Sequence, residues 1–515
     1  MRLGRSYKDA INALNSLQSN FAAVQAARFL DVLPQQRSML SLNEVLEYSR
    51  RLGYAPDDFN RLNVIHIAGT KGKGSTCAFT ESILSRYRGQ DSISKIGLFT
   101  SPHLVSVRER IRIDGEPISK SKFAHYFFEV WDRLSSTTSD AGQCPTLQPS
   151  AEVKPMYFKY LTLLSFHVFM CENVDTAIYE VGVGGRYDCT NIVRRPSVAA
   201  VTSLGIDHTF MLGDTIESIA WNKAGIFKRG CSAVVCEQPD YPQSMDIVER
   251  EARATGVSSF EVVHASAVPA HVRLGLAGDF QHRNAAVAVA IARTHLRQLG
   301  IDFGLLNAGT DTITDGDASF ALPDAFVRGL ACARWDGRCQ TIRNSPGYDR
   351  VTWYIDGAHT VESIRGACAW FRGAVTRCDV PRVLLFNQQN RDNTTQLLQH
   401  LYEGVRETPQ VAFDHVVFTT NVTWGDGSSN PDFVSMNVSK DVVDKMVVQK
   451  KLAEWWAALD VQHGLSAHKH IFPNIEKSLR FIHSLTNDKW DVEVFVCGSL
   501  HLVGGVLAVL KGIRD

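Results

Sequence analysis

The sequence predicts an α/β protein of two domains: an N-terminal P-loop-containing domain on a mainly parallel sheet, and a smaller, Rossmann-like C-terminal domain. Three observations predict this fold. The chain has 515 residues, enough for about two to four domains of ordinary size. Short apolar runs rich in β-branched residues alternate with helical patterns, as in parallel sheets covered on both faces. A glycine-rich loop joins the first such run to the first helical pattern.

In the first domain, the apolar runs predict strands and the longer periodic segments predict helices. The strands are expected at Leu62–Ala68, Ile96–Phe99, Thr176–Val181 and Val198–Ser203. The helices are expected at Cys77–Tyr87, Tyr157–Cys171 and Asn284–Arg297. Ahead of them, apolar residues at helical spacing between Tyr7 and Val24 predict an amphipathic helix. The basic residues near it leave a mitochondrial address as the alternative.

The second domain shows another alternation of strands and helices. Its strands are expected at Val351–Asp356, Arg382–Asn387, His415–Thr419 and Val492–Cys497. The polar stretch Asn307–Asp317 precedes them, and Ser135–Ser150 reads as an exposed loop in the first domain. We therefore divide the chain into domains at 1–325 and 326–515, and we expect a functional site in the cleft between them.

Composition excludes several classes of protein. Lys and Arg together number 54, and so do Asp and Glu, so the zero net charge argues against a nucleic-acid partner. No apolar run reaches the ~18 residues of a membrane helix, so no membrane is required. None of the 11 cysteines forms a CxxC pair, which favours a reducing compartment. We expect a cytoplasmic protein, with the mitochondrion as a second location.

The glycine-rich loop, Gly69–Thr76, is the first candidate functional element. Glycines let backbone N–H groups approach phosphate oxygens, and the N-terminus of the following helix adds partial positive charge. Lys73 would reach the terminal phosphates, and the hydroxyl of Ser75 or Thr76 would help to hold a magnesium ion. The strict P-loop pattern fails because Ile67 and Gly74 stand at two of its positions. A simple glycine-rich turn therefore remains the alternative.

Other polar residues follow predicted strands, where ligands gather in α/β sheets. Glu180 ends one strand and suits magnesium, although an exposed strand end is an equal alternative. His208 follows the next strand, and a structural hydrogen-bonding role is its alternative. Lys223 reads equally as a surface lysine. In the second domain, Asp356 ends a strand, with a helix N-cap as the alternative, and Arg338 offers a positive charge.

Taken together, these segments resemble the folylpolyglutamate synthase family, in its eukaryotic, fungal form, which is related to the Mur peptide ligases. The matching stretches occur in the family's order and read IAGTKGKGS, LFTSPHLVSVRERIRIDG, YFKYLTLLSFHVF, EVGVGGRYDCTNI, SLGIDHTFMLGDTIESIAWNKAGIFK, GRCQTI, YIDGAHT, LLFNQQNRD and CGSLHLVGGVL. The resemblance implies a monomeric, ATP-dependent ligase with an ATPase domain. It would add L-glutamate to the γ-carboxylate of tetrahydrofolate or a folylpolyglutamate through an acyl phosphate, releasing ADP and phosphate.

The resemblance also assigns roles to residues. It implies that ATP contacts Lys71, Gly72, Lys73, Gly74, Ser75, Arg338 and Asp356. Two Mg²⁺ ions would be held by Ser101, Glu180, His208 and a carbamylated Lys223. Lys73, Lys223 and His359 would act in catalysis, with His359 near the reacting phosphate or the incoming glutamate. A monovalent cation such as K⁺ is a further candidate, and the segment Ser101–Arg112 would help to hold folate.

The chain departs from the family pattern in places, and other functions remain to be weighed. Gly278–Asn284 lacks a histidine of the bacterial pattern, Asp336 replaces a common proline, and Gln388 and Gln389 replace an Asn-x-Thr pattern. Dihydrofolate synthase is the nearest alternative because it uses the same fold and chemistry on dihydropteroate. A regulatory ATP-binding protein and a kinase are the others.

Overall fold

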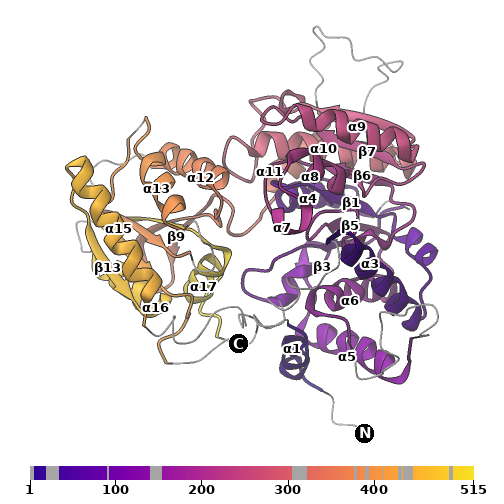
Figure 1. The fold of residues 1–515 in the computed structure, drawn as a ribbon, viewed down its shortest axis with the longest axis horizontal. Coiled ribbons are helices and arrows are strands. Elements are labelled where there is room, and N and C mark those ends of the chain that lie inside the picture. Colours follow the sequence, from indigo (N-terminus) through magenta and orange to yellow (C-terminus); the bar gives the residue numbers. More distant parts are fainter. Residues whose placement is uncertain are drawn as a thin grey trace.

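The computed structural model contains two α/β units that lie side by side (Figure 1). It describes residues 5–18, 34–89, 92–139, 154–303, 322–375, 380–388, 394–408, 410–426, 432, 445–486 and 491–514. The predicted segment Asn307–Asp317, Gln389 and most of Ser135–Ser150 lie outside these ranges. Among the described residues, no helix is both long and apolar enough to span a membrane.

The first unit is built on an eight-stranded sheet with the strand order β4-β3-β2-β5-β1-β6-β7-β8. Its strands are β1 (Ile65–Ala68), β2 (Ile96–Phe99), β3 (Ile111–Ile113), β4 (Glu116–Pro117), β5 (Thr176–Glu180), β6 (Val198–Val201), β7 (Ser232–Cys236) and β8 (Ser259–Val263). All neighbouring pairs from β2 to β8 are parallel, and β3 and β4 add an antiparallel edge. The predicted mainly parallel sheet is confirmed.

Helices cover both faces of this sheet, which explains why its central strands are entirely buried. One core forms beneath α4 (Lys73–Leu84), α10 (Gln281–Gln298) and α11 (Asp324–Cys332). A second core contains residues of α1 (Tyr7–Asn15), α5 (Lys120–Ser136) and α6 (Tyr157–Cys171). The third core lies under α8 (Ile216–Ala224) and α9 (Gln243–Thr255). The part of this unit that the structure describes also contains the α-helices α3 (Pro34–Arg51) and α7 (Thr209–Leu212).

The second unit is built on a six-stranded sheet with the order β13-β12-β11-β14-β10-β9. Its strands are β9 (Gln340–Ser345), β10 (Tyr348–Ile355), β11 (Arg382–Phe386), β12 (His415–Thr419), β13 (His468–Phe472) and β14 (Val492–Cys497), and only the β9–β10 pair is antiparallel. Residues of α12 (Val361–Ala374), α13 (Thr394–Gly404) and α15 (Val447–His463) form one core. Those of α16 (Ile475–Ser484) and α17 (Leu500–Leu510) form another. The Rossmann-like class is thereby confirmed.

The predicted domain division between residues 325 and 326 falls inside α11. This helix packs against α4 so closely that a Cβ on Gly329 would lie 2.6 Å from the Ile83 Cα. The Ser82 hydroxyl also donates to the Gly329 carbonyl at 2.6 Å. These contacts associate α11 with the first sheet, and the division itself stays a proposal.

The two units touch through the segment that follows β2. Val105 belongs to the same core as α17, and a Cβ on Gly504 would lie 2.0 Å from the Leu104 carbonyl oxygen. The Asp432 carboxylate accepts hydrogen bonds from the Val107 N–H at 2.9 Å and the Tyr7 hydroxyl at 2.9 Å. This contact brings the carboxyl ends of strands in both sheets toward a shared site.

Candidate functional site

The glycine-rich loop leaves β1 and turns into α4 with its backbone packed tightly against neighbouring side chains. Gly69 has φ +152°, and a Cβ there would lie 1.8 Å from the Thr202 Oγ1. Gly72, in the left-handed region with φ +82°, is the N-cap of α4, and its Cβ would lie 2.1 Å from the Asn284 Oδ1. Both positions require glycine. The loop therefore places backbone N–H groups at a helix N-terminus, an arrangement typical of phosphate sites.

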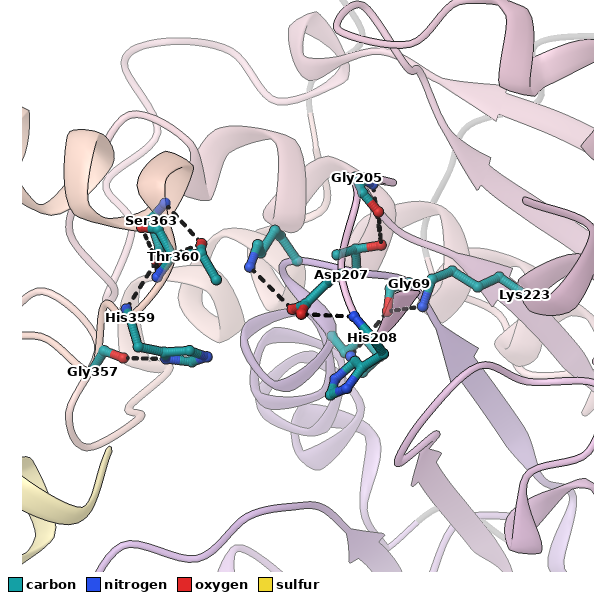
Figure 2. A network of polar contacts seen from close by, with 12 residues as sticks. Gly69, Gly205, Asp207, His208, Lys223, Gly357, His359, Thr360 and Ser363 are labelled. Carbon is teal, nitrogen blue, oxygen red and sulfur yellow. Dashed lines mark hydrogen bonds and ion pairs between the residues drawn. The ribbon is translucent and has the colours of Figure 1, made fainter. Parts of the chain in front are cut away.

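Three lysine side chains converge on this loop. The Lys73 and Lys223 ammonium groups both donate to the Gly69 carbonyl, at 2.9 and 2.8 Å, although they come from different helices. The Lys71 ammonium lies 3.6 Å from the Asp207 carboxylate. Figure 2 shows Lys223 and Asp207 on either side of Gly69. Burial and the neighbouring Lys73 hold the pKa of Lys223 well below its ordinary value.

Glu180 occupies the carboxyl end of β5, as its position in the sequence predicts, and is buried rather than exposed. Its carboxylate accepts a hydrogen bond from the Ser101 N–H at 3.1 Å. Burial raises the pKa of Glu180, whereas Lys73, the Ser101 N–H and Arg338 lower it. The carboxylate therefore lies within electrostatic reach of a lysine from one domain and an arginine from the other.

Gly74, in the first turn of α4, lies next to Glu180. A Cβ at this residue would lie 3.7 Å from both carboxylate oxygens of Glu180 and 3.2 Å from the Trp335 Nε1. Gly74, one of the two positions that break the strict P-loop pattern, is thus the one where the helix approaches the buried carboxylate. A larger side chain would fill the space beside Glu180.

His208 and His359 lie at the edges of the site. His208 is the N-cap of α7 with φ 52°, is exposed, and donates its N–H to the Asp207 carboxylate at 2.9 Å. The His359 Nδ1 donates to the Gly357 carbonyl at 2.7 Å, and because a carbonyl only accepts, Nδ1 carries the proton. In Figure 2 the His359 imidazole, from the second domain, extends toward the side where Asp207 and His208 lie.

Asp356 and Arg338 form the second domain's part of the site. Asp356 follows β10, is buried, and accepts a hydrogen bond from the Cys339 N–H at 2.8 Å. Burial raises the pKa of Asp356, and Arg338 acts against this shift. The helix after it is capped by Thr360, so the N-cap alternative for Asp356 is wrong.

The structure therefore brings most of the predicted site residues together around the loop and adds residues that the sequence analysis did not single out. Gln281 donates to the Ser75 Oγ at 3.3 Å, and Asn284 abuts Gly72. Arg110 is buried near Glu180. Two polar side chains at the start of an apolar helix were a usable signal for Gln281 and Asn284. No local signal marks Arg110.

Known proteins resemble the chain over its whole length. A folylpolyglutamate synthase of Candida albicans is 54% identical and matches 100% of this chain and 98% of its own length. One from Saccharomyces cerevisiae (strain FostersO) is 47% identical, matching 99% of this chain and 88% of its own length. Residues 342–509 match the family described as "Dihydrofolate synthetase, C-terminal domain".

Solved structures share the fold. The Mycobacterium tuberculosis folylpolyglutamate synthase complexed with ADP has a TM-score of 0.67 at 22% identity, covering 98% of this chain and 100% of that one. E. coli FolC in complex with DHPP and ADP has a TM-score of 0.64 at 24% identity, covering 99% of both chains.

The fold, the site and the full-length relatives together define an ATP-dependent ligase in which a glycine-rich loop on one α/β domain faces charged residues from a second. Within that class, the relatives at 54% and 47% identity are matched along essentially the entire chain. The chain belongs to the folylpolyglutamate synthase family.

Proposed function

We propose that the protein adds L-glutamate to the γ-carboxylate of tetrahydrofolate and of folylpolyglutamates, using ATP. The observation that carries this proposal is the convergence of Lys73 and Arg338, from different domains, on the buried Glu180 beside the glycine loop. Such a site can bind a nucleoside triphosphate next to a second substrate. The full-length relatives named as folylpolyglutamate synthases support the choice of that substrate.

The chemistry requires activation of the folate carboxylate, because O⁻ is a poor leaving group. Transfer of the γ-phosphoryl group makes an acyl phosphate, and this step depends mainly on charge neutralisation and positioning. We assign the neutralisation to Lys73, Arg338 and the N-terminus of α4. ADP and phosphate are the products once the glutamate amine has displaced the phosphate.

Magnesium fits the donor set on this side of the loop. Glu180 offers a carboxylate, Ser101 lies against it, and His208 stands next to the Asp207 carboxylate. We propose that two Mg²⁺ ions are held by Ser101, Glu180, His208 and carbamylated Lys223, with K⁺ as a further cation. When bound, the ions would neutralise phosphate charge. Lys73 and Arg338 oppose the effect of burial and favour the ionised Glu180 that a metal site needs.

Carbamylation of Lys223 is favoured by the same burial that makes a lysine there unusual. Only a neutral amine attacks CO₂, and burial together with Lys73 lowers the pKa of Lys223, so the neutral form is populated at lower pH than for an exposed lysine. Carbamylation would replace a buried cation by an oxygen ligand of the kind that Mg²⁺ prefers.

We therefore expect Lys223→Ala to lose activity and to recover part of it when short carboxylic acids are added, because they can supply the missing carboxylate oxygens. Turnover measured with labelled glutamate, with and without acetate or propionate, checks this. The matched control is Lys228→Ala, a lysine whose pKa burial also lowers and whose ammonium contacts the Asn191 carbonyl at 3.4 Å instead of the loop. Equal rescue of both variants, or rescue of neither, would contradict the carbamylated lysine.

The second step needs a neutral glutamate amine and a site without water, since water would hydrolyse the acyl phosphate. The two domains supply facing parts of the site, with Arg338, Asp356 and His359 from the second. We propose that domain closure excludes water and that His359 lies near the reacting phosphate or the incoming glutamate.

Replacing Arg338, the positively charged side chain that the second domain contributes to the site, tests this arrangement. We expect Arg338→Ala to lower turnover at least tenfold while the fold stays intact, because charge on the transferred group would lose one of its partners. Arg343→Ala, on the neighbouring β9 strand, is the control and should retain activity. Near-normal turnover of Arg338→Ala would remove this residue from the proposed mechanism.

The function itself is tested with purified protein, ATP, Mg²⁺, labelled glutamate and either tetrahydrofolate or dihydropteroate. Product of increasing tail length from tetrahydrofolate supports the proposal. Glutamate addition to dihydropteroate alone would instead establish dihydrofolate synthase, a candidate favoured by the family match of residues 342–509. A phosphorylated product released without glutamate would indicate a kinase, and slow hydrolysis alone a regulatory protein. We further propose a monomer of the cytoplasm, with the mitochondrion as a second location.

A further inference from the structure

A group of potential metal ligands lies where α5 packs against α6, on elements that the proposed catalytic site does not use. Each helix carries two such residues four positions apart, His125 and Glu129 on α5 and His167 and Cys171 on α6. Residues four apart share one face of a helix. The ligand atoms of Glu129, His167 and Cys171 all lie within 4.8 Å of one another.

The distances around His167 are near those of a small tetrahedral metal site. Its Nε2 lies 3.0 Å from the Glu129 Oε2 and 3.7 Å from the Cys171 Sγ. Around a zinc ion with bonds of about 2.0–2.3 Å to nitrogen, oxygen and sulfur, ligand atoms would be roughly 3.3–3.7 Å apart. The three atoms lie within 4.8 Å of one another, so side-chain shifts of roughly 1 Å would bring all of them to this spacing around an ion.

Two further residues hold the ligands in place. The Tyr54 hydroxyl lies 2.8 Å from the His167 Nδ1, which leaves Nε2 for the carboxylate, while the Cys171 sulfur lies beside the ring, 3.7 Å from Nε2 and 3.9 Å from Nδ1. The His125 Nε2 lies 3.2 Å from the other carboxylate oxygen of Glu129. Metal-binding histidines and carboxylates are commonly oriented by such outer partners.

We propose that Glu129, His167 and Cys171 form a zinc site that joins α5 to α6. Zn²⁺ would bind the Glu129 Oε2, the His167 Nε2 and the Cys171 sulfur, with water in the fourth position. Binding breaks the S–H bond of Cys171, releases that proton to solvent and forms the S–Zn bond, so one carboxylate and one thiolate balance the charge of the ion.

The alternative interpretation is an ordinary hydrogen-bonded pair of a histidine and a carboxylate, but such a pair does not explain the thiol beside it. Such a pair occurs elsewhere in the chain, where the exposed His264 lies 2.7 Å from the Glu237 carboxylate. Among the described residues, no cysteine joins that pair to form a group of three metal ligands. The thiol of Cys171, on the same helical face as a largely buried histidine, is what makes the α5–α6 group suited to zinc rather than to magnesium.

The site is remote from the glycine loop, so it would act on stability and not on the reaction. α6 begins at Tyr157, whose ring lies near the buried Arg110, and ends at Cys171. The 15 residues of this helix span about 21 Å from first to last Cα. Because Cys171 is exposed, Cys171→Ser should fold and keep its glutamate-adding activity.

The test uses untagged, full-length protein freed of metal by chelation and titrated with Zn²⁺ against a chromophoric competitor, and with Co²⁺ followed by absorption. We expect one tight Zn²⁺ per chain, a thiolate-to-cobalt charge-transfer band and a higher melting temperature with zinc. Cys171→Ser and Glu129→Gln should each weaken zinc affinity by at least about a hundredfold, and His125→Ala by roughly ten- to a hundredfold.

Two control variants match the proposed ligands in chemistry. Cys332→Ser removes another exposed thiol, and His264→Ala removes the histidine of the other carboxylate pair. Both should retain the zinc affinity and the cobalt band. The proposal is overturned if the chain binds no zinc tightly, if Cys171→Ser binds it unchanged, or if Cys332→Ser loses it equally. Because glutamate addition is measured separately, failure of the zinc site leaves the proposed function unaffected.

Discussion

Lys73→Ala is expected to lower the turnover of glutamate addition by roughly 10²–10³-fold, the usual effect of removing one group that stabilises developing charge. Lys73 stands at the first position of α4, where its ammonium and the helix N-terminus act on the same region. Its hydrogen bond in this structure is to the loop's own Gly69 carbonyl, so no distant part of the fold depends on it. The measurement is incorporation of labelled glutamate at saturating ATP.

The control for this prediction is Lys122→Ala. That lysine also pairs with a polar partner, the Glu172 carboxylate, but it lies on α5, away from the loop. Its loss should leave turnover within about twofold, because Lys122 is half exposed and Glu172 keeps its hydrogen bond from Tyr126. If Lys73→Ala retained near-normal turnover, or if both variants lost activity equally, the loop would not be acting on phosphate through this lysine.

Glu180→Gln is expected to lower the turnover of glutamate addition by roughly 10²–10³-fold, as for Lys73→Ala. The same substitution is expected to make the folded chain more stable. The amide can still accept the Ser101 N–H, but it binds Mg²⁺ poorly. Burial places the folded-state pKa of Glu180 above its unfolded value, with Lys73 and Arg338 acting against the shift. The destabilisation by the carboxylate is therefore absent below the unfolded pKa, accumulates as pH rises to the folded pKa and is complete above it.

Melting curves measured at several pH values check the predicted gain in stability of Glu180→Gln. The variant should melt roughly 1–3 °C higher than the natural chain near neutral pH, and the difference should disappear in acid. Glu172→Gln is a control of opposite sign, since burial is outweighed there by hydrogen bonds from Lys122 and Tyr126, which hold the pKa of Glu172 below its ordinary value. A Glu180→Gln chain with full activity, or one less stable at neutral pH, would contradict the buried-ligand interpretation.

The strongly apolar elements were the ones that could be predicted before the structure. The helix expected at Tyr157–Cys171 has those bounds, and the run expected at Thr176–Val181 is β5, because both are buried and carry a continuous apolar signal. Strands β3, β4, β7, β8, β9 and β13 were not predicted. Most residues of β3, β4, β8, β9 and β13 are only partly buried, so tertiary pairing rather than hydrophobic pattern defines them. The β7 strand is fully buried, and its short apolar run was missed.

Among the site residues, the sequence predicted where those at the ends of predicted strands would lie. Glu180 and Asp356 end parallel strands, and chain order alone brings such ends to one edge of each sheet. The expectations left open by local sequence were decided by contacts. Lys223 is buried against the Gly69 carbonyl instead of lying at the surface, and Asp356 does not cap a helix.

Local chemistry, meaning apolar periodicity, the glycines of the loop and acids after strands, was enough to specify the α/β class and a candidate phosphate site, whereas the kind of reaction followed from the resemblance to the folylpolyglutamate synthase family. It did not specify distances between segments far apart in the chain. The placement of Arg110 and Arg338 near Glu180, or of Cys171 beside Glu129, depends on how helices and the two domains pack. Packing is a property of many weak contacts acting together, and no short stretch of residues encodes it.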